Sequence, residues 1–137
     1  MIEDILATAR RLAEALDAED YSAARATLAE GCVYHTGTTT LVGREAIIGS
    51  YRANGEAAHG RFDEIHYASR VDPSETSGAV ITYTDRVRCG GEWHEFRCRQ
   101  HVRIGATGLV EEIRHEELPG ERERLQEFEH RRTTGCG

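Results

Sequence analysis

The chain has 137 residues, of which 39% are hydrophobic and 30% are charged. These values are typical of one globular domain that buries about two-thirds of its unfolded surface, and they exclude a disordered chain. The 24 acidic residues outnumber the 17 basic ones, and the net charge of −7 argues against a nucleic-acid-binding face. No apolar run approaches the ~20 residues that cross a bilayer, and the acidic start is unlike a signal peptide. We therefore expect a cytoplasmic protein with no nucleic-acid or membrane partner.

The cysteines and the common motifs give little information about function. Cys32, Cys89, Cys98 and Cys136 do not form the Cys-x-x-Cys pattern of zinc or redox sites. We expect unpaired thiols in a reducing compartment, with Cys136 in a loose tail. The sequence has no phosphate-binding loop, dinucleotide fingerprint, His-Glu-x-x-His or Gly-x-Ser-x-Gly motif. Function must therefore be inferred from the polar residues that fall on the predicted core.

Helices are predicted first along the chain. Apolar residues at helical spacing predict a helix over 3–17, and Asp20 is placed to cap a second helix that stops at Gly31. A short β-run follows at 32–36. A Gly-Thr-Thr-Thr loop then leads to a third helix at about 43–54, and Gly55 to Gly60 is predicted as a loop.

From Phe62 onward the hydrophobic period changes to two, which is typical of strands. We expect strands at 62–71, 79–88, 93–104 and 109–118, with Gly90-Gly91 as a hairpin turn. Helices followed by an antiparallel meander predict an α+β fold, in which three N-terminal helices pack in the concave face of a strongly curved, mainly antiparallel sheet. This single domain spans 1–118. Residues 119–137 are predicted as a charged, solvated C-terminal helix and a flexible tail.

The hairpin at Gly90-Gly91 predicts which residues share a face, because directly opposed residues of a hairpin point the same way. A second hairpin with Ile104 opposite Leu109 places His115 opposite Cys98. A one-residue slip would invert both faces. The core face of the first hairpin then holds the pairs Val87/His94, Asp85/Phe96, Tyr83/Cys98, Ile81/Gln100 and Ala79/Val102.

Several polar residues interrupt this core face: Asp85, His94, Gln100 and His115. A buried carboxylate must be paired or protonated, so Asp85 either belongs to an internal network or lines a cavity as acid, base or ligand contact. We expect the cavity, with the pKa of Asp85 raised by desolvation.

The remaining candidates are weaker. His94, near a turn, can equally point to water, and Cys98 is interpreted as a small buried hydrophobe. No residue spacing demands a metal site built from His35, His94, His115 or Asp85, so we expect neither metal nor cofactor. Solvent is the expected environment of His59, His66, His101 and His130.

The layout resembles the SnoaL-like branch of the nuclear-transport-factor-two-like superfamily, an α+β cone with a cystatin-like fold. The resemblance covers about 1–118 and rests on the segments 15–21, 32–36, 41–47, 100–104 and 108–113. Members include polyketide cyclases, steroid isomerases, epoxide hydrolases, dehydratases and non-catalytic binding domains, so the resemblance implies a fold and leaves the activity open. It also implies a homodimer through the outer face of the sheet.

The resemblance implies roles for a few positions. The base of the steroid isomerases falls at His35, while their oxyanion-hole Asp and Tyr fall at Gln100 and near Leu12, so the isomerase set is incomplete. A His can still abstract a proton, and a Gln can still polarise an oxygen. The acid–arginine–acid set of the epoxide hydrolases is also incomplete, because Arg88 and His115 stand where acids are expected.

We therefore predict a pocket for a small apolar molecule, with cofactor-free acid/base chemistry of isomerase, cyclase or dehydratase type. The alternatives are a binding domain without chemistry and a structural dimer module whose interface contains Trp93, Thr82 and Thr84. The candidate catalytic residues are His35, Asp85 and His115, and the candidate ligand-binding residues are Tyr67, Tyr83, His94, Phe96, Cys98 and Gln100.

Overall fold

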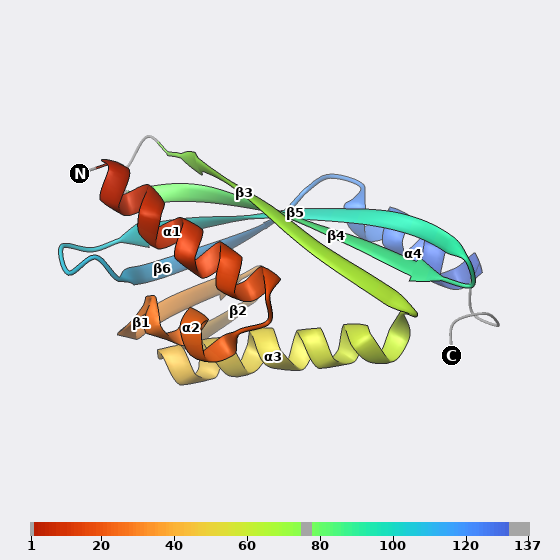
Figure 1. Cartoon of the computed structure of the whole chain (residues 1–137), viewed down its shortest axis with the longest axis horizontal. Helices are drawn as coiled ribbons and strands as arrows, with labels where there is room; N and C mark the ends of the chain where they lie inside the picture. Colours follow the sequence, from red (N-terminus) through yellow and green to blue (C-terminus); the bar gives the residue numbers. More distant parts are fainter. Residues whose placement is uncertain (1, 75–77, 132–137) are drawn as a thin grey trace.

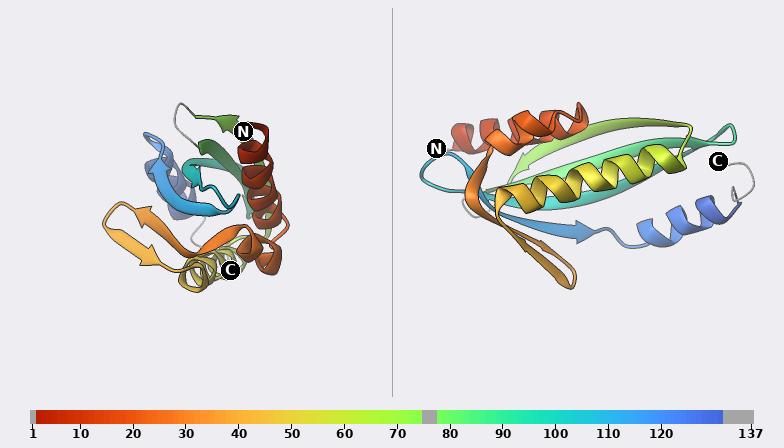
Figure 2. Two further views of the ribbon diagram at one scale, coloured as in Figure 1. Left: turned by 90° about the vertical axis from the view of Figure 1, so that its left-hand side faces the viewer. Right: turned by 90° about the horizontal axis from the view of Figure 1, so that it is seen from below.

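The computed structural model describes residues 2–74 and 78–131 and confirms the predicted α+β cone. Helices α1 (Ile2–Asp17), α2 (Tyr21–Ala26) and α3 (Arg44–Arg61) lie on the concave side of one curved, unclosed sheet, and α4 (Glu121–Arg131) lies at its far end (Figures 1 and 2). The strand order is β2-β1-β6-β5-β4-β3. The strands are β1 (Leu28–Thr36), β2 (Thr39–Val42), β3 (Glu64–Pro73), β4 (Gly78–Cys89), β5 (Glu92–Ile104) and β6 (Val110–Glu117).

The N-terminal half differs from the prediction in three places. Helix α2 ends at Ala26, because the chain enters β1 at Leu28. The predicted Gly-Thr-Thr-Thr loop instead contains β2, whose β-branched residues pair with β1 in the antiparallel sense. Helix α3 continues through the predicted loop 55–60 and ends at Arg61, where its last turns pack against the apolar residues beneath α4. Asp20 does cap α2, and its carboxylate accepts the Ala23 N–H at 3.1 Å.

The register of the β4–β5 hairpin is the predicted one, with Asp85 opposite Phe96 and Tyr83 opposite Cys98. The second hairpin is shifted by two residues, so that His115 lies opposite Gln100 rather than Cys98. One residue of this shift comes from the turn, which places Ile104 opposite Val110 instead of Leu109, and the other from an irregularity between Arg103 and Ile104. Because the shift is an even number of residues, His115 still points to the predicted face.

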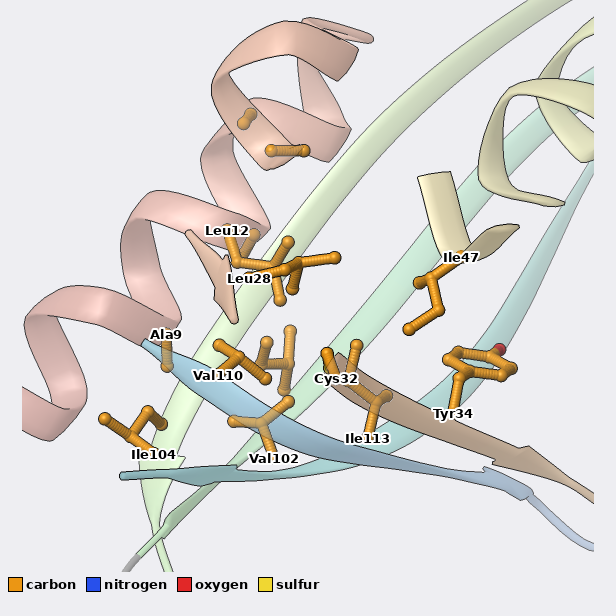
Figure 3. Packing of buried hydrophobic residues seen from close by; sticks show 14 of the residues in the cluster. Ala9, Leu12, Leu28, Cys32, Tyr34, Ile47, Val102, Ile104, Val110 and Ile113 are labelled. Carbon is orange, nitrogen blue, oxygen red and sulfur yellow. The ribbon is translucent and has the colours of Figure 1, made fainter. Parts of the chain in front are cut away.

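Two apolar clusters fill the concave side of the sheet. The larger one joins α1, α3 and the wide end of the sheet, with Leu12, Leu28, Ile47 and Ile113 fully buried (Figure 3). The smaller one lies under α4 and contains Phe62, Val87, Cys89 and Phe128. The predicted charged helix is therefore docked rather than solvated on all sides, because its two apolar residues, Leu125 and Phe128, fall on one face.

The cysteines differ from the prediction at one position. Cys32 and Cys98 are free, as expected, but Cys89 is disulfide-bonded. The prediction of an unpaired thiol is therefore wrong for Cys89, because sequence spacing does not show which sulfurs meet in space. Cys136 and the predicted flexible tail at 132–137 lie outside the described residues. No helix within 2–74 and 78–131 has the length and apolar character needed to cross a membrane.

Candidate ligand-binding site

A cavity of about 210 Å³ lies on the concave face, between the two apolar clusters. The inner face of β4 shows why it forms there. Ile81 belongs to the large cluster and Val87 to the small one, while Tyr83 and Asp85 between them line the cavity. The inner faces of the neighbouring strands change from apolar to polar residues at the same level of the sheet, so their polar side chains surround one cavity. The walls are Leu16, Asp17, Glu19, Tyr21, Tyr34, Tyr51, Asn54, Gly55, Ala58, Tyr67, Tyr83, Asp85, Cys98, Gln100 and His115.

The structure brings two-thirds of the predicted site residues together in this cavity and places the others elsewhere. His35, His94 and Phe96 do not line it. The residues that do are Tyr67, Tyr83, Asp85, Cys98, Gln100 and His115.

His35 points away from the cavity because successive residues of a strand alternate between faces. Its Nε2 lies 3.1 Å from Glu112 Oε2, and its Nδ1 lies 3.5 Å from Thr40 Oγ1. The neighbouring Tyr34 occupies the inner position instead and is buried, with its ring at the edge of the large cluster (Figure 3). Cys32, an apolar residue two positions earlier, shares a strand face with Tyr34. This spacing is the sequence signal that could have indicated an inward-facing Tyr34.

His94 lies beyond the cavity, against α4. The ring of His94 stacks on Phe128 with 5.1 Å between centroids, and burial lowers the pKa of His94. Phe96 is opposite Asp85 in the register but does not reach the cavity wall. The narrow end of the cone is thus filled by side chains from α4, which the sequence pattern of β5 could not indicate.

Gln100 is committed to the protein itself. Its Oε1 accepts a hydrogen bond from the Tyr51 hydroxyl at 2.6 Å, and its Nε2 donates to the Tyr34 hydroxyl at 3.0 Å. The second Nε2 hydrogen faces His115 Nδ1 at 3.4 Å. An amide nitrogen only donates, so His115 Nδ1 accepts, and a neutral ring carries its proton on Nε2. Gln100 therefore has no free amide hydrogen with which to polarise a ligand, the role predicted for it.

Asp85 is the least satisfied acidic group of the cavity. Among the described residues its carboxyl makes no hydrogen bond or ion pair. Burial, reinforced by the Asp17 carboxylate, raises the pKa of Asp85 to about 6. Burial also raises the pKa of Asp17, although its Oδ2 accepts a hydrogen bond from Ser69 Oγ at 2.6 Å. Asp85 can therefore exist in both protonation states near neutral pH.

The phenols and the thiol of the cavity remain protonated. Burial raises the pKa of Tyr34, Tyr67 and Cys98 to about 12 in each case. Cys98 is therefore a small apolar wall residue, as expected, rather than a thiolate. The Tyr83 hydroxyl is buried and has no hydrogen-bond partner among the described residues, and Tyr34 only accepts the bond from Gln100. Among the residues that the structure describes, two phenol hydrogens of the cavity walls thus lack an acceptor.

Sequence reasoning missed six polar wall residues: Asp17, Glu19, Tyr21, Tyr34, Tyr51 and Asn54. Asp17 and Tyr51 come from helices, whereas the prediction used only cross-strand pairing to assemble the site. Tyr51 lies on the apolar face of the third helix, and its hydroxyl group on that face was the sequence signal that could have indicated a polar wall residue. The described residues bring no three His, Cys, Asp or Glu side chains together as metal ligands.

Comparison with known proteins gives structural matches only. No family model and no curated protein matches the chain. An NTF2-like protein of unknown function from Burkholderia pseudomallei matches 89% of this chain and 96% of its own, with 18% identity and a TM-score of 0.69. A proposed polyketide cyclase from Xanthomonas campestris matches 93% and 95%, with 14% identity and a TM-score of 0.67.

A third match carries a ligand. RV0760c from Mycobacterium tuberculosis, solved in complex with estradiol-17β-hemisuccinate, matches 86% of this chain and 96% of its own, with 17% identity and a TM-score of 0.63. Identities this low show the fold and leave the activity open. The helices on a curved sheet, the strand order and these matches together show that the chain has the NTF2-like α+β cone fold.

Proposed function

We propose that the chain binds a compact, largely apolar molecule in this cavity and moves a proton on it without a cofactor, with Asp85 as the acid/base group. The observation that carries the proposal is the unpartnered, half-buried Asp85 carboxyl with its pKa raised to about 6. A general acid or base acts best when its pKa is near the working pH. A carboxyl with a purely structural role would instead be paired or hydrogen-bonded.

The unmatched phenols support a ligand that carries an oxygen acceptor. A buried hydroxyl without an acceptor destabilises the protein by about 1–3 kcal/mol, which a bound oxygen would recover. A carbonyl oxygen has two lone pairs and can accept from both Tyr34 and Tyr83. Donors at this oxygen stabilise the charge that develops when Asp85 removes a proton nearby. Isomerisation, cyclisation and dehydration all contain such a proton movement.

The volume of the cavity limits the ligand. At about 210 Å³ it is smaller than the ~300–1,000 Å³ of typical drug-sized sites. One or two fused rings fit this volume, whereas a steroid would require the rim to move. The structural match that was solved with an estradiol derivative supports a small-molecule role for this chain.

The proposal is tested by a thermal-shift screen with one- and two-ring ketones, enones and lactones, followed by hydrogen–deuterium exchange of the hits in D2O. We expect the wild-type protein to accelerate exchange at the carbon beside the carbonyl, for example of 2-tetralone, and Asp85→Asn to lose about 10²–10⁴-fold of this acceleration. Tyr83→Phe serves as the matched variant that weakens binding but keeps the base. If ligands bind and exchange stays at the buffer rate, the alternative of a binding domain without chemistry replaces catalysis.

We also propose that the outer face of the sheet forms a homodimer interface. Trp93 is 39% exposed there, an unusual position for a tryptophan. Its ring is stacked on His66 at 5.8 Å, and the guanidinium of Arg86 lies 4.5 Å from its centroid. An exposed aromatic residue in contact with an arginine is typical of the centre of a protein interface.

Sedimentation of the 15.3 kDa chain tests the homodimer. We expect a species of twice that mass at micromolar concentration and a monomer for Trp93→Glu, because a carboxylate would be desolvated at the centre of the interface. Val42→Glu is the control, since Val42 is 68% exposed on a different strand. A wild-type monomer at all concentrations would refute the interface.

A further inference from the structure

The turn between α1 and α2 crosses to α3 beside the cavity. The Glu19 carboxylate in this turn lies 2.8 and 3.0 Å from His59 Nε2 on α3. Tyr21 donates to the same carboxylate at 3.4 Å, and the guanidinium of Arg52 lies 5.2 Å from the Tyr21 ring centroid. Glu19, Tyr21 and Gly55 all line the cavity. We call Glu19, Tyr21, Arg52, Gly55 and His59 the rim strap.

The backbone at Glu19 adopts a conformation that favours glycine. Its φ is +54°, and no other non-glycine residue within 2–74 and 78–131 has a positive φ. Helix α1 ends here in a Schellman motif, in which Asp20 N donates to Ala15 O at 2.8 Å and Glu19 N to Leu16 O at 3.0 Å. Glycine would relax this position, but it has no carboxylate to reach His59. An outlier that persists beside a candidate site suggests a functional constraint.

Helix α3 presents a matching face to the turn. Arg52, Gly55 and His59 are spaced three and four residues apart, so they lie on one side of the helix. A Cβ on Gly55 would lie 2.6 Å from Tyr21 Oη and 3.1 Å from Glu19 Oε2. The glycine therefore allows the turn to lie directly against the helix. His59, expected to be a solvent residue, contacts the Glu19 carboxylate here while its side chain remains 52% exposed.

Stability alone does not explain this arrangement. An exposed His–Glu pair contributes little to folding, and the left-handed backbone at Glu19 opposes it by a similar amount. The strap does have a geometric consequence, because it ties the turn to α3 at the cavity wall. We propose that the rim strap limits the size of the molecules that enter the cavity. The inference rests on the proposed function, since the cavity must take a ligand.

Cys98 allows the rim to be tested without knowing the ligand. Its free thiol lines the cavity, whereas the free thiol of Cys32 is fully buried in the large cluster. Because burial raises the pKa of the Cys98 thiol to about 12 and only the thiolate reacts, modification by methyl and benzyl methanethiosulfonate is run at alkaline pH and followed at each cysteine by peptide mass spectrometry. We expect Cys98 of the wild-type protein to react with the methyl reagent and much more slowly with the benzyl reagent. Modification of Cys32 reports global unfolding.

Variants of the strap should change this size selectivity. Glu19→Gly and His59→Ala should raise the benzyl-to-methyl rate ratio at Cys98 by about fivefold or more, because each removes the tie to α3. Gly55→Ala should act in the same direction by displacing Tyr21, although alanine favours the helix. His101→Ala is the matched control, since it removes a His–Glu pair of 2.9 Å on the outer face.

The outcomes separate the two proposals. An unchanged rate ratio in Glu19→Gly and His59→Ala, with Cys98 still open to the methyl reagent, would overturn the size filter and leave the cavity intact. Resistance of wild-type Cys98 to both reagents, equal to that of Cys32, would show a closed cavity and remove the proposed function as well. If Cys32 also reacts faster in one variant, that variant has unfolded. In that case Gly55→Ala, in which alanine favours helix α3, becomes the decisive variant. A raised benzyl-to-methyl rate ratio at Cys98 supports the size filter, and an unchanged ratio overturns it.

Discussion

Asp85→Asn is expected to stabilise the protein at about pH 8, by roughly 1–2 kcal/mol, and to leave stability almost unchanged near pH 4. Burial raises the pKa of Asp85 from its ordinary value of 3.8 to about 6. Between these two pH values the folded state binds more protons than the unfolded state, so the contribution of this group to stability falls as pH rises. Asparagine cannot ionise, so Asp85→Asn removes this loss of stability at higher pH.

Urea denaturation of both proteins at several pH values measures this difference. Asp72→Asn on β3 is the control, because the Asp72 side chain is 49% exposed and its pair with Arg70 lies in solvent. A constant destabilisation by Asp85→Asn at every pH would contradict the expectation and indicate a hydrogen-bonded structural carboxyl. Higher stability with lost proton exchange is the pattern of a group retained for function rather than for folding.

Phe128→Ala is expected to lower the free energy of unfolding by about 3 kcal/mol. Phe128 is 1% exposed, stacks on His94 and closes the small cluster with Phe62 and Val87. Because α4 contains only one further apolar contact residue, Leu125, the truncation should release the helix itself. Amide hydrogen exchange should then accelerate across α4 and much less in α1, which packs in the large cluster.

Glu127→Ala is the matched control for this truncation. The side chain of Glu127 is 69% exposed and, within the described ranges, pairs only with Arg131, one helical turn away. Its removal should therefore change stability by less than about 0.5 kcal/mol. Equal protection of α4 in Phe128→Ala and the wild-type protein would show that the helix is held by other contacts. Loss of protection in α1 as well would show that the two clusters unfold as one unit.

The sequence by itself determined the β4–β5 half of the site. Alternation of period two and a two-glycine turn are local signals, so they predict both the register and the face of Tyr83, Asp85, Cys98 and Gln100. The same alternation predicted the raised pKa of Asp85, because a single carboxyl group among the apolar residues of the core face loses contact with water. The order of helices and strands likewise predicted the α+β class, and the family resemblance implied the cone.

Only the tertiary structure decided the rest. Whether Tyr34 or His35 points inward depends on how β1 pairs with β6, a parallel contact between segments distant in the sequence and interrupted by an irregularity. The commitment of Gln100 to Tyr51 and Tyr34, the tie between Glu19 and His59, and the docking of α4 likewise join separate elements. Periodicity reports the environment of a residue along its own element. It carries no information on which distant side chain supplies a hydrogen-bond partner, and such partners determine which polar groups remain free for a ligand.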